Sequence, residues 1–134
     1  GQGKLTDTPL HFARCVAAIA GGGVYCSPDL TGKAAAKPRR VMQAKNAKTL
    51  LAYMRTVVAE GTGSGADYRG RSAGKTATAQ SGRYVQGREV LNTYFAGVYP
   101  FDRPRYAIVV MRENGTSGAA DCCPVFRRIV SSLP

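Results

Sequence analysis

A lysine among small hydroxyl residues is the part of this sequence with the clearest chemical potential. The segment Gly74-Lys75-Thr76-Ala77-Thr78-Ala79-Gln80 has the composition of a β-strand and carries one ammonium group between small side chains. A lysine flanked by hydroxyls on a strand edge offers a positive charge and hydrogen-bond donors, which together suit a carboxylate ligand. The same pattern is more often an ordinary exposed lysine, so these residues alone leave both interpretations open.

Other short motifs near this strand match known chemistry only formally. Gly74–Thr76 lacks the glycine spacing of a phosphate-binding P-loop and leads into strand-like sequence, where a P-loop leads into a helix. Gly61–Ala66 matches the dinucleotide pattern GxGxxA, but it follows a predicted helix and opens a polar loop. Ser72–Lys75 matches the SxxK motif of serine acyl-transfer enzymes, which requires a helix where this sequence predicts a strand. We interpret all of these matches as accidental.

The potential metal ligands are few and scattered. The chain has four cysteines and one histidine, with no CxxC pair, and His11 is far in sequence from most of the cysteines. The sequence therefore predicts neither a metal site nor a cofactor. We expect the cysteines to be small buried apolar residues, with a Cys15–Cys26 disulfide as an open alternative. The four are Cys15, Cys26, Cys122 and Cys123.

The charge of the chain is high and uneven. Nineteen Lys and Arg residues stand against eight Asp and Glu, which gives a net charge of +11. The segment from Leu30 to Ala59 contains seven Lys and Arg residues and no acidic residue. No RNA-binding aromatic motif or zinc-finger spacing accompanies it, so we interpret it as a solvated basic surface and expect no nucleic-acid partner. Anionic wall polymers and lipid head groups remain alternatives.

Length and hydropathy set further bounds. A chain of 134 residues with 44% hydrophobic residues can form one domain, or part of one. The longest strongly apolar run, Ala107–Met111, is far short of the roughly 20 residues of a membrane-spanning helix. The polar opening Gly1–Lys4 does not resemble a signal peptide.

The elements that must position the lysine segment can be predicted from periodicity and turn signals. Helices are expected where apolar residues recur at helical spacing, and strands where β-forming residues lie between turns. The predicted helices are Thr8–Ala20 (ended by Gly21–Gly23), Asn46–Glu60 and Pro124–Leu133. The predicted strands are Val24–Cys26, Arg40–Met42, Arg71–Gln80 (with a turn at Ser81-Gly82), Leu91–Tyr99 and Tyr106–Glu113 (followed by a turn at Asn114-Gly115). The expected class is α+β, with helices packed on a three-stranded antiparallel sheet.

Several segments together resemble one family. Gly74–Gln80 resembles the KTG box of penicillin-binding proteins, usually written GKTGTAQ, and the other similar segments occur in family order over nearly the whole chain. These segments are Gly1–Gly3, Thr8–Leu10, Val16–Val24, Glu60–Gly63 with Ala66, Asn92–Pro100, Tyr106–Val110 and Pro124–Ile129. The chain most resembles class B, high-molecular-weight transpeptidases, and corresponds to the C-terminal segment of their transpeptidase domain.

The resemblance implies a function and a set of roles. It implies a partial transpeptidase fold, similar to serine β-lactamases, in a D,D-transpeptidase that cross-links peptidoglycan and is acylated by β-lactams. Lys75 would anchor the substrate carboxylate and support proton transfer, and the hydroxyls of Thr76 and Thr78 would hydrogen-bond that carboxylate. The backbone N–H of Thr78 would supply half of an oxyanion hole. The D-Ala-D-Ala stem peptide would add as a strand along this edge, beside Ala77 and Gln80.

Two departures from the family pattern limit these expectations. The third residue of the box is Ala77 instead of glycine, and its methyl group is expected to crowd a ligand. The family's SxxK and SxN motifs precede the matching region, and no convincing copy of either is present. We therefore expect this chain to carry one wall of an active site without the nucleophile, and to be inactive alone. Residues 1–70 would form a helical part with a basic loop, and residues 71–134 the KTG-type strand, two further strands and the closing helix.

Alternative functions remain open at this stage. A β-lactam sensor domain shares the fold, although the connector at Glu60–Gly63 and the helix after Thr8 favour the transpeptidase. A basic module that binds wall polymer or nucleic acid would depend on the charge of Leu30–Ala59 alone. The resemblance further implies a location on the extracytoplasmic face of a bacterial membrane, with any anchor outside this chain. The edge of the 106–113 strand is expected to be unpaired and to favour self-association.

Overall fold

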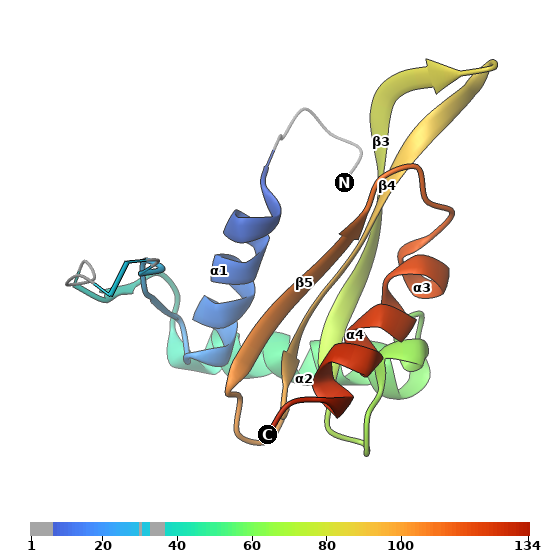
Figure 1. Cartoon of the computed structure of the whole chain (residues 1–134). Coiled ribbons are helices and arrows are strands. Elements are labelled where there is room, and N and C mark those ends of the chain that lie inside the picture. The colour runs from blue at the N-terminus through green and yellow to red at the C-terminus, as the bar shows by residue number, and fades with distance from the viewer. Residues whose placement is uncertain (1–6, 30, 33–36) are drawn as a thin grey trace.

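The computed structural model describes residues 7–29, 31–32 and 37–134. The predicted Gly1–Gly3 motif and the basic residue Lys33 lie outside these residues. Figure 1 shows the elements in chain order. They are α1 (Pro9–Ala20), β1 (Val24–Tyr25), β2 (Arg39–Arg40), α2 (Ala44–Glu60), the 3₁₀ turn η1 (Ser64–Ala66), β3 (Ala73–Val85), β4 (Arg88–Tyr99), β5 (Tyr106–Arg112), α3 (Gly118–Asp121) and α4 (Cys123–Ser131).

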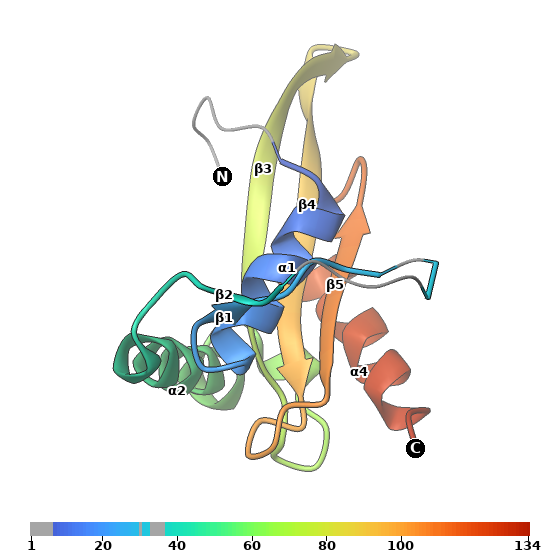
Figure 2. The same cartoon turned by 90° about the vertical axis from the view of Figure 1, so that its left-hand side faces the viewer.

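A three-stranded antiparallel sheet in the order β3-β4-β5 forms the centre of the fold. Helices α3 and α4 cover one face, here called the closed face, and α1 and α2 lie against the other, here called the groove face (Figures 1 and 2). The predicted α+β class with a three-stranded sheet packed by helices is confirmed. Within the described residues, β3 and β5 each keep one edge without a strand partner. No helix in this part of the chain combines the length and hydrophobicity needed to cross a membrane.

The hairpin of β3 and β4 is longer than the sequence predicts. The predicted turn at Ser81-Gly82 is wrong, because β3 continues to Val85 and the chain reverses at Gln86-Gly87. Gln86 and Gly87 both have positive φ (51° and 76°), as two-residue hairpin turns of type I′ require. Ser81 and Gly82 instead fall where the β3–β4 register shifts. The hairpin therefore extends well beyond β5 (Figure 1).

Helix α1 begins and ends at the predicted signals. The hydroxyl of Thr8 accepts a hydrogen bond from the backbone N–H of His11 (3.2 Å), and Pro9 occupies the first turn. After the helix, Gly23 has a φ of +89°, and a β-carbon there would collide with the backbone of Met42. Only glycine fits this close approach, so the glycine run sets the direction in which the chain leaves α1.

Helix α2 and the short strands are displaced slightly from their predicted positions. Helix α2 begins at Ala44, two residues before the predicted Asn46, and ends at Glu60 as predicted. Gln43 makes no side-chain capping bond, so the start of this helix has no capping signal in the sequence. Strand β2 lies one residue earlier than predicted, where it pairs with β1.

The closed face contains a complete aromatic core. Phe95 of β4 and Phe126 of α4 are fully buried, with ring centroids 4.7 Å apart in an edge-to-face arrangement. Gly74 of β3 lies beneath these rings, since a β-carbon at this position would collide with the ring of Phe95. The same buried cluster also contains Val58 of α2, Val130 of α4, Ala66 and the two cysteines Cys122 and Cys123. The strand that carries the lysine is therefore packed tightly on this side.

The groove face has a smaller core. Val16, Met54, Ala73 and Val98 are buried there, and all are smaller than the aromatic residues on the other side. This cluster holds α1 and α2 against the sheet near the start of β3. Farther along β3 the helices and the sheet leave an open groove, described below.

The C-terminal segment contains one more helix than predicted. The predicted helix Pro124–Leu133 is observed as α4, and the short helix α3 precedes it. Ser117 caps α3 by accepting a hydrogen bond from the N–H of Ala120 (3.1 Å). A four-residue helix is too short to show an apolar period, which explains why it was missed.

The four cysteines divide into two classes. Cys122 and Cys123 are buried as predicted, and burial, followed by the neighbouring Cys122, raises the pKa of the Cys123 thiol to about 11. The prediction is wrong for Cys15 and Cys26, which are exposed. All four are free thiols, so the alternative of a Cys15–Cys26 disulfide is not realised in the structure.

Candidate functional site

The five residues predicted to form the site lie in a row on β3, at one edge of the sheet. Side chains alternate along a strand, so Lys75 and Ala77 point to the groove face and Thr76, Thr78 and Gln80 to the opposite face. Thr76 also borders the groove, together with Lys75 and Ala77. Because β3 is an edge strand, both sets flank the same edge. The fold thus keeps the predicted residues together on one continuous segment.

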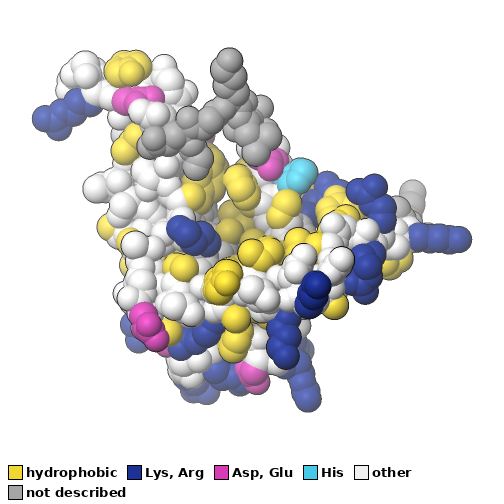
Figure 3. Space-filling view, turned by 180° about the vertical axis from the view of Figure 1, so that it is seen from behind, with side chains coloured by type: hydrophobic (Ala, Val, Ile, Leu, Met, Phe, Trp, Pro, Cys, Tyr) yellow, Lys and Arg dark blue, Asp and Glu magenta, His cyan; other side chains and the backbone are white. Residues whose placement is uncertain are grey.

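A groove of about 420 Å³ opens beside this segment, between α1, α2 and the sheet. In Figure 3 it appears as a hollow lined mainly by hydrophobic side chains. Phe12, Leu50 and Tyr53 border it and are 38%, 39% and 65% exposed, which is high for large apolar residues. A concave apolar surface of this kind is typical of a binding groove. Lys75 supplies its positive charge.

Tyr94 of β4 lies in the floor of the groove, opposite Ala77. Its ring packs against Phe12 of α1, with the centroids 5.7 Å apart. Burial, followed by the charge of Glu113, raises the pKa of the Tyr94 hydroxyl. This hydroxyl therefore stays protonated near neutral pH and is able to donate a hydrogen bond.

Lys75 and Thr76 are held by local hydrogen bonds. The Nζ of Lys75 donates to the carbonyl oxygen of Thr76 (2.8 Å). Among the described residues, no carboxylate lies within ion-pair distance of Lys75. The hydroxyl of Thr76 shares a hydrogen bond with the hydroxyl of Thr62, in the connector after α2 (2.8 Å). The charge of Lys75 is thus free to meet an anionic ligand, and the Thr76 hydroxyl has a defined position.

Thr78 and Gln80 have neighbours on β4. Thr78 is half-buried and lies opposite Thr93 in the ladder. The side-chain amide of Gln80 donates to the carboxylate of Glu89 (2.8 Å). The amide of Gln80 is therefore already paired within the hairpin, and its role in substrate binding stays a prediction.

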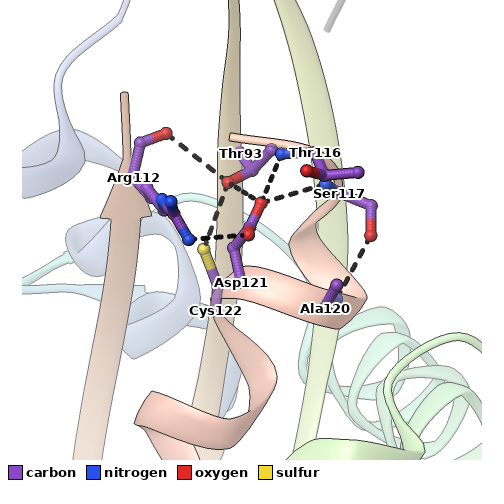
Figure 4. A network of polar contacts seen from close by, with 7 residues as sticks. All are labelled: Thr93, Arg112, Thr116, Ser117, Ala120, Asp121 and Cys122. Carbon is purple, nitrogen blue, oxygen red and sulfur yellow. Dashed lines mark hydrogen bonds and ion pairs between the residues drawn. The ribbon is translucent and has the colours of Figure 1, made fainter. Parts of the chain in front are cut away.

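A polar network behind β4, not predicted from the sequence, centres on Asp121 (Figure 4). Its Oδ2 accepts hydrogen bonds from the N–H groups of Thr116 (2.6 Å) and Ser117 (3.0 Å) and from the Thr93 hydroxyl (3.1 Å). Its Oδ1 pairs with the guanidinium of Arg112 (3.0 Å), and the side chain is 7% exposed. These contacts, led by the Thr116 N–H, lower the pKa of Asp121.

The network holds a loop directly against the candidate site. At Gly118, which starts α3, a β-carbon would collide with the carbonyl oxygen of Tyr94 and lie 2.9 Å from that of Ala77. The loop fixed by Asp121 therefore packs under the part of β3 that carries Ala77. Asp121 itself makes no hydrogen bond or ion pair to the five predicted site residues, all of which the structure describes. One residue in the sequence could have indicated helix α3. Ser117 is a typical helix-capping residue, and its hydroxyl accepts a hydrogen bond from the N–H of Ala120, three positions later.

The motifs interpreted as accidental lack the geometry of their chemistry. Ser72 is fully buried, and its hydroxyl accepts a hydrogen bond from the N–H of Tyr68 (3.1 Å), while Lys75 lies on an exposed strand. Gly74–Thr76 lies inside β3, and Gly61–Ala66 connects α2 to η1. Nor do three or more His, Cys, Asp or Glu side chains gather in the part of the chain that the structure describes.

Known proteins show similarity over most of the chain. Residues 1–131 match the family model described as the penicillin-binding protein transpeptidase domain. The peptidoglycan D,D-transpeptidase MrdA of Acinetobacter baumannii is 33% identical over 90% of this chain and 21% of its own length. Stage V sporulation protein D of Bacillus subtilis is 31% identical over 100% of this chain and 24% of its own length. The peptidoglycan D,D-transpeptidase FtsI of Escherichia coli strain K12 is 33% identical over 96% and 23%.

Solved structures give the same result for the fold. The transpeptidase domain of Burkholderia pseudomallei penicillin-binding protein 3 superposes with a TM-score of 0.72 at 25% identity, covering 89% of this chain and 39% of that one. The D,D-transpeptidase domain of an Eggerthella lenta peptidoglycan glycosyltransferase also superposes with a TM-score of 0.72, at 23% identity. This match covers 92% of this chain and 31% of that one. The chain spans at most about a quarter of the curated relatives described above. On the match over residues 1–131, this chain belongs to the penicillin-binding protein transpeptidase domain family.

Proposed function

We propose that this chain supplies the KTG-type wall of the active-site cleft of a D,D-transpeptidase that cross-links peptidoglycan. The observation that carries the proposal is the position of Lys75–Thr78 on an edge strand beside an open groove. Relatives whose names describe them as peptidoglycan D,D-transpeptidases support the reaction class. Because peptidoglycan is cross-linked outside the cytoplasm, the proposal places the protein at the extracytoplasmic face of the bacterial membrane.

In this proposal the residues of β3 bind the carboxylate end of a D-Ala-D-Ala stem peptide. Lys75 attracts the carboxylate and supports proton transfer, and the hydroxyls of Thr76 and Thr78 donate hydrogen bonds to it. The N–H of Thr78 forms half of an oxyanion hole. The peptide lies along the edge of β3 as an added strand, past Ala77 and Gln80. A β-lactam occupies the same place.

The division of the domain is part of the same proposal. Residues 1–70 form a helical part and residues 71–134 carry the wall strand, two further strands and the closing helix. Together they are the C-terminal part of one transpeptidase domain, and the nucleophilic serine lies on another part of it. A fluorescent penicillin should then leave the 134-residue chain unlabelled, and covalent labelling would contradict the assignment.

Binding of N-acetyl-D-Ala-D-Ala, followed by NMR, tests the wall directly. We expect shifts at Lys75–Thr78 and a loss of affinity of about tenfold or more for Lys75→Ala, since a charge-assisted bond disappears. Lys45→Ala, on an exposed part of α2, is the matched charge control and should change little. A second ligand, in which the C-terminal carboxylate is replaced by an amide, has no negative charge for Lys75 to bind. The wild-type chain should therefore bind this amide about as weakly as the Lys75→Ala variant binds the acid. Equal binding of acid and amide would reject the proposed role of Lys75.

Ala77→Gly is the sharpest single substitution in this test. The glycine removes the methyl group that is expected to crowd the ligand, so affinity for the peptide acid should rise. The backbone at Ala77 is extended within β3, and glycine can adopt this conformation without a change in the strand. A fall in affinity with an unchanged melting temperature would show that the methyl group contributes to binding.

The free edge of β5 is proposed as a surface for self-association. Its residues 106–112 are mostly half-buried, and an unpaired strand edge presents a row of backbone donors and acceptors. Light scattering at increasing concentration should show a dimer, weakened by Met111→Lys, which adds a charge to the edge. A strict monomer at high concentration would contradict this proposal.

A further inference from the structure

A second pocket lies at the end of the sheet opposite the projecting hairpin. It has a volume of about 480 Å³ and is bordered by four arginines: Arg69, Arg71, Arg103 and Arg105. The loop before β3 and the loop between β4 and β5 bring the arginines together, and Figure 1 shows both loops at the lower end of the molecule. Ser131, Leu133 and Pro134, at and after the end of α4, form the third side of the pocket. None of these arginines belongs to the Lys75–Gln80 segment of β3 proposed to bind the peptide.

The pocket carries more positive than negative charge, and the side chains of all four arginines are exposed to solvent. Arg71 pairs with Asp102 through several short contacts, from 2.8 to 2.9 Å. That bond and the nearby positive charges lower the pKa of Asp102, which therefore stays ionised. Among the described residues, this is the only ion pair that any of the four arginines makes. Arg69, Arg103 and Arg105 therefore border the pocket without a carboxylate partner among the described residues, and an anion bound there would reduce the repulsion between their charges.

The two loops are braced against each other by backbone and ring contacts. The N–H of Phe101 donates to the carbonyl oxygen of Arg71 (2.6 Å). The rings of Tyr68 and Tyr99, one from each side of the pocket, lie with centroids 5.9 Å apart. The guanidinium of Arg69 packs over the ring of Tyr68 at 5.1 Å. The pocket is therefore formed before any ligand binds, which reduces the entropy lost on binding.

We propose that this pocket binds a phosphate or diphosphate group. Guanidinium groups match the oxygen geometry of phosphate and stay charged at every physiological pH. Tyr68 and Tyr99 also border the cavity. The basic residues of α2 differ, because Lys45 and Lys48 are spread along an exposed helix surface and border none of the pockets described here. The inference is independent of the function proposed for β3.

Isothermal titration of the whole chain with inorganic pyrophosphate, at constant ionic strength, tests the proposal. Arg103→Gln/Arg105→Gln should weaken binding at least tenfold, whereas Lys45→Gln/Lys48→Gln, with the same loss of charge, should change it less than twofold. Circular dichroism checks that each variant is folded, and Arg69→Gln provides a second pocket variant if the double substitution unfolds the chain. No binding by the wild-type chain, or equal losses in pocket and α2 variants, would overturn the proposal.

A second experiment distinguishes a lipid head group from a soluble or polymer-borne phosphate as the ligand. Vesicles of phosphatidylglycerol mixed with phosphatidylcholine are compared with vesicles of phosphatidylcholine alone. Pocket-dependent binding to the anionic vesicles, displaced by pyrophosphate, would assign the site to a lipid head group. Pyrophosphate binding without vesicle binding would assign it to a soluble or polymer-borne phosphate.

Discussion

The two faces of the same sheet are built differently. On the closed face, the aromatic pair Phe95 and Phe126 and the network around Asp121 pack against the sheet. On the groove face, large side chains such as Tyr53 remain exposed beside Lys75. From this comparison we expect the closed face to supply most of the stability, and we infer that the groove face is the one available for binding. A strand with functional residues can be held rigidly from behind while its other side stays accessible.

The largest expected effect comes from removing an aromatic ring on the closed face. Phe95→Ala should lower the free energy of unfolding by about 3–5 kcal/mol, because it leaves a cavity in a fully packed cluster. Tyr53→Ala in the groove should change it by only about 0.5 kcal/mol, since its side chain is mostly exposed. Denaturant unfolding measures both values. Comparable losses for the two variants would mean that the faces contribute equally.

A smaller effect is expected at Asp121. Asp121→Asn places an amide donor against the N–H groups of Thr116 and Ser117, so the melting temperature at pH 7 should fall clearly. Asp102→Asn, which breaks an exposed ion pair, serves as the control and should change it little.

The pH dependence of this effect has a definite sign. The pKa of Asp121 lies below its ordinary value of 3.8 in the folded state, so the carboxylate stabilises the fold above that value. The stabilisation is lost as the pH falls through the lowered pKa. The difference in melting temperature between wild type and Asp121→Asn should therefore be full at pH 7 and shrink below pH 3.8. A difference that stays constant down to pH 2 would show that the charge does not matter.

The mildest test labels the thiols without changing the protein. At pH 8, Cys15 and Cys26 should react quickly with a disulfide reagent, whereas Cys122 and Cys123 should react only after unfolding. Burial on the closed face blocks access, and the pKa of about 11 keeps the Cys123 thiol protonated. Cys15→Ser/Cys26→Ser removes the fast phase and is the control. Rapid labelling of all thiols in the folded chain would contradict a closed core on that face.

Local signals in the sequence determined much of this protein. The Thr8-Pro9 start, the glycines after α1 and the apolar stripe of α2 predicted two helices, and the composition around Lys75 predicted its strand. These signals work because capping, turn geometry and periodicity involve residues a few positions apart. The resemblance of several segments to one family was equally readable, and the family was confirmed by the match over residues 1–131.

Tertiary structure alone decided which residues are enclosed and which converge. Cys15 and Cys122 look alike as small apolar residues, yet only the packing of helices on the sheet makes one exposed and the other buried. Asp121 and the four arginines of the second pocket come from segments distant in sequence, brought together by strand pairing and loop packing. Burial and convergence depend on long-range contacts, which leave no local pattern in the chain.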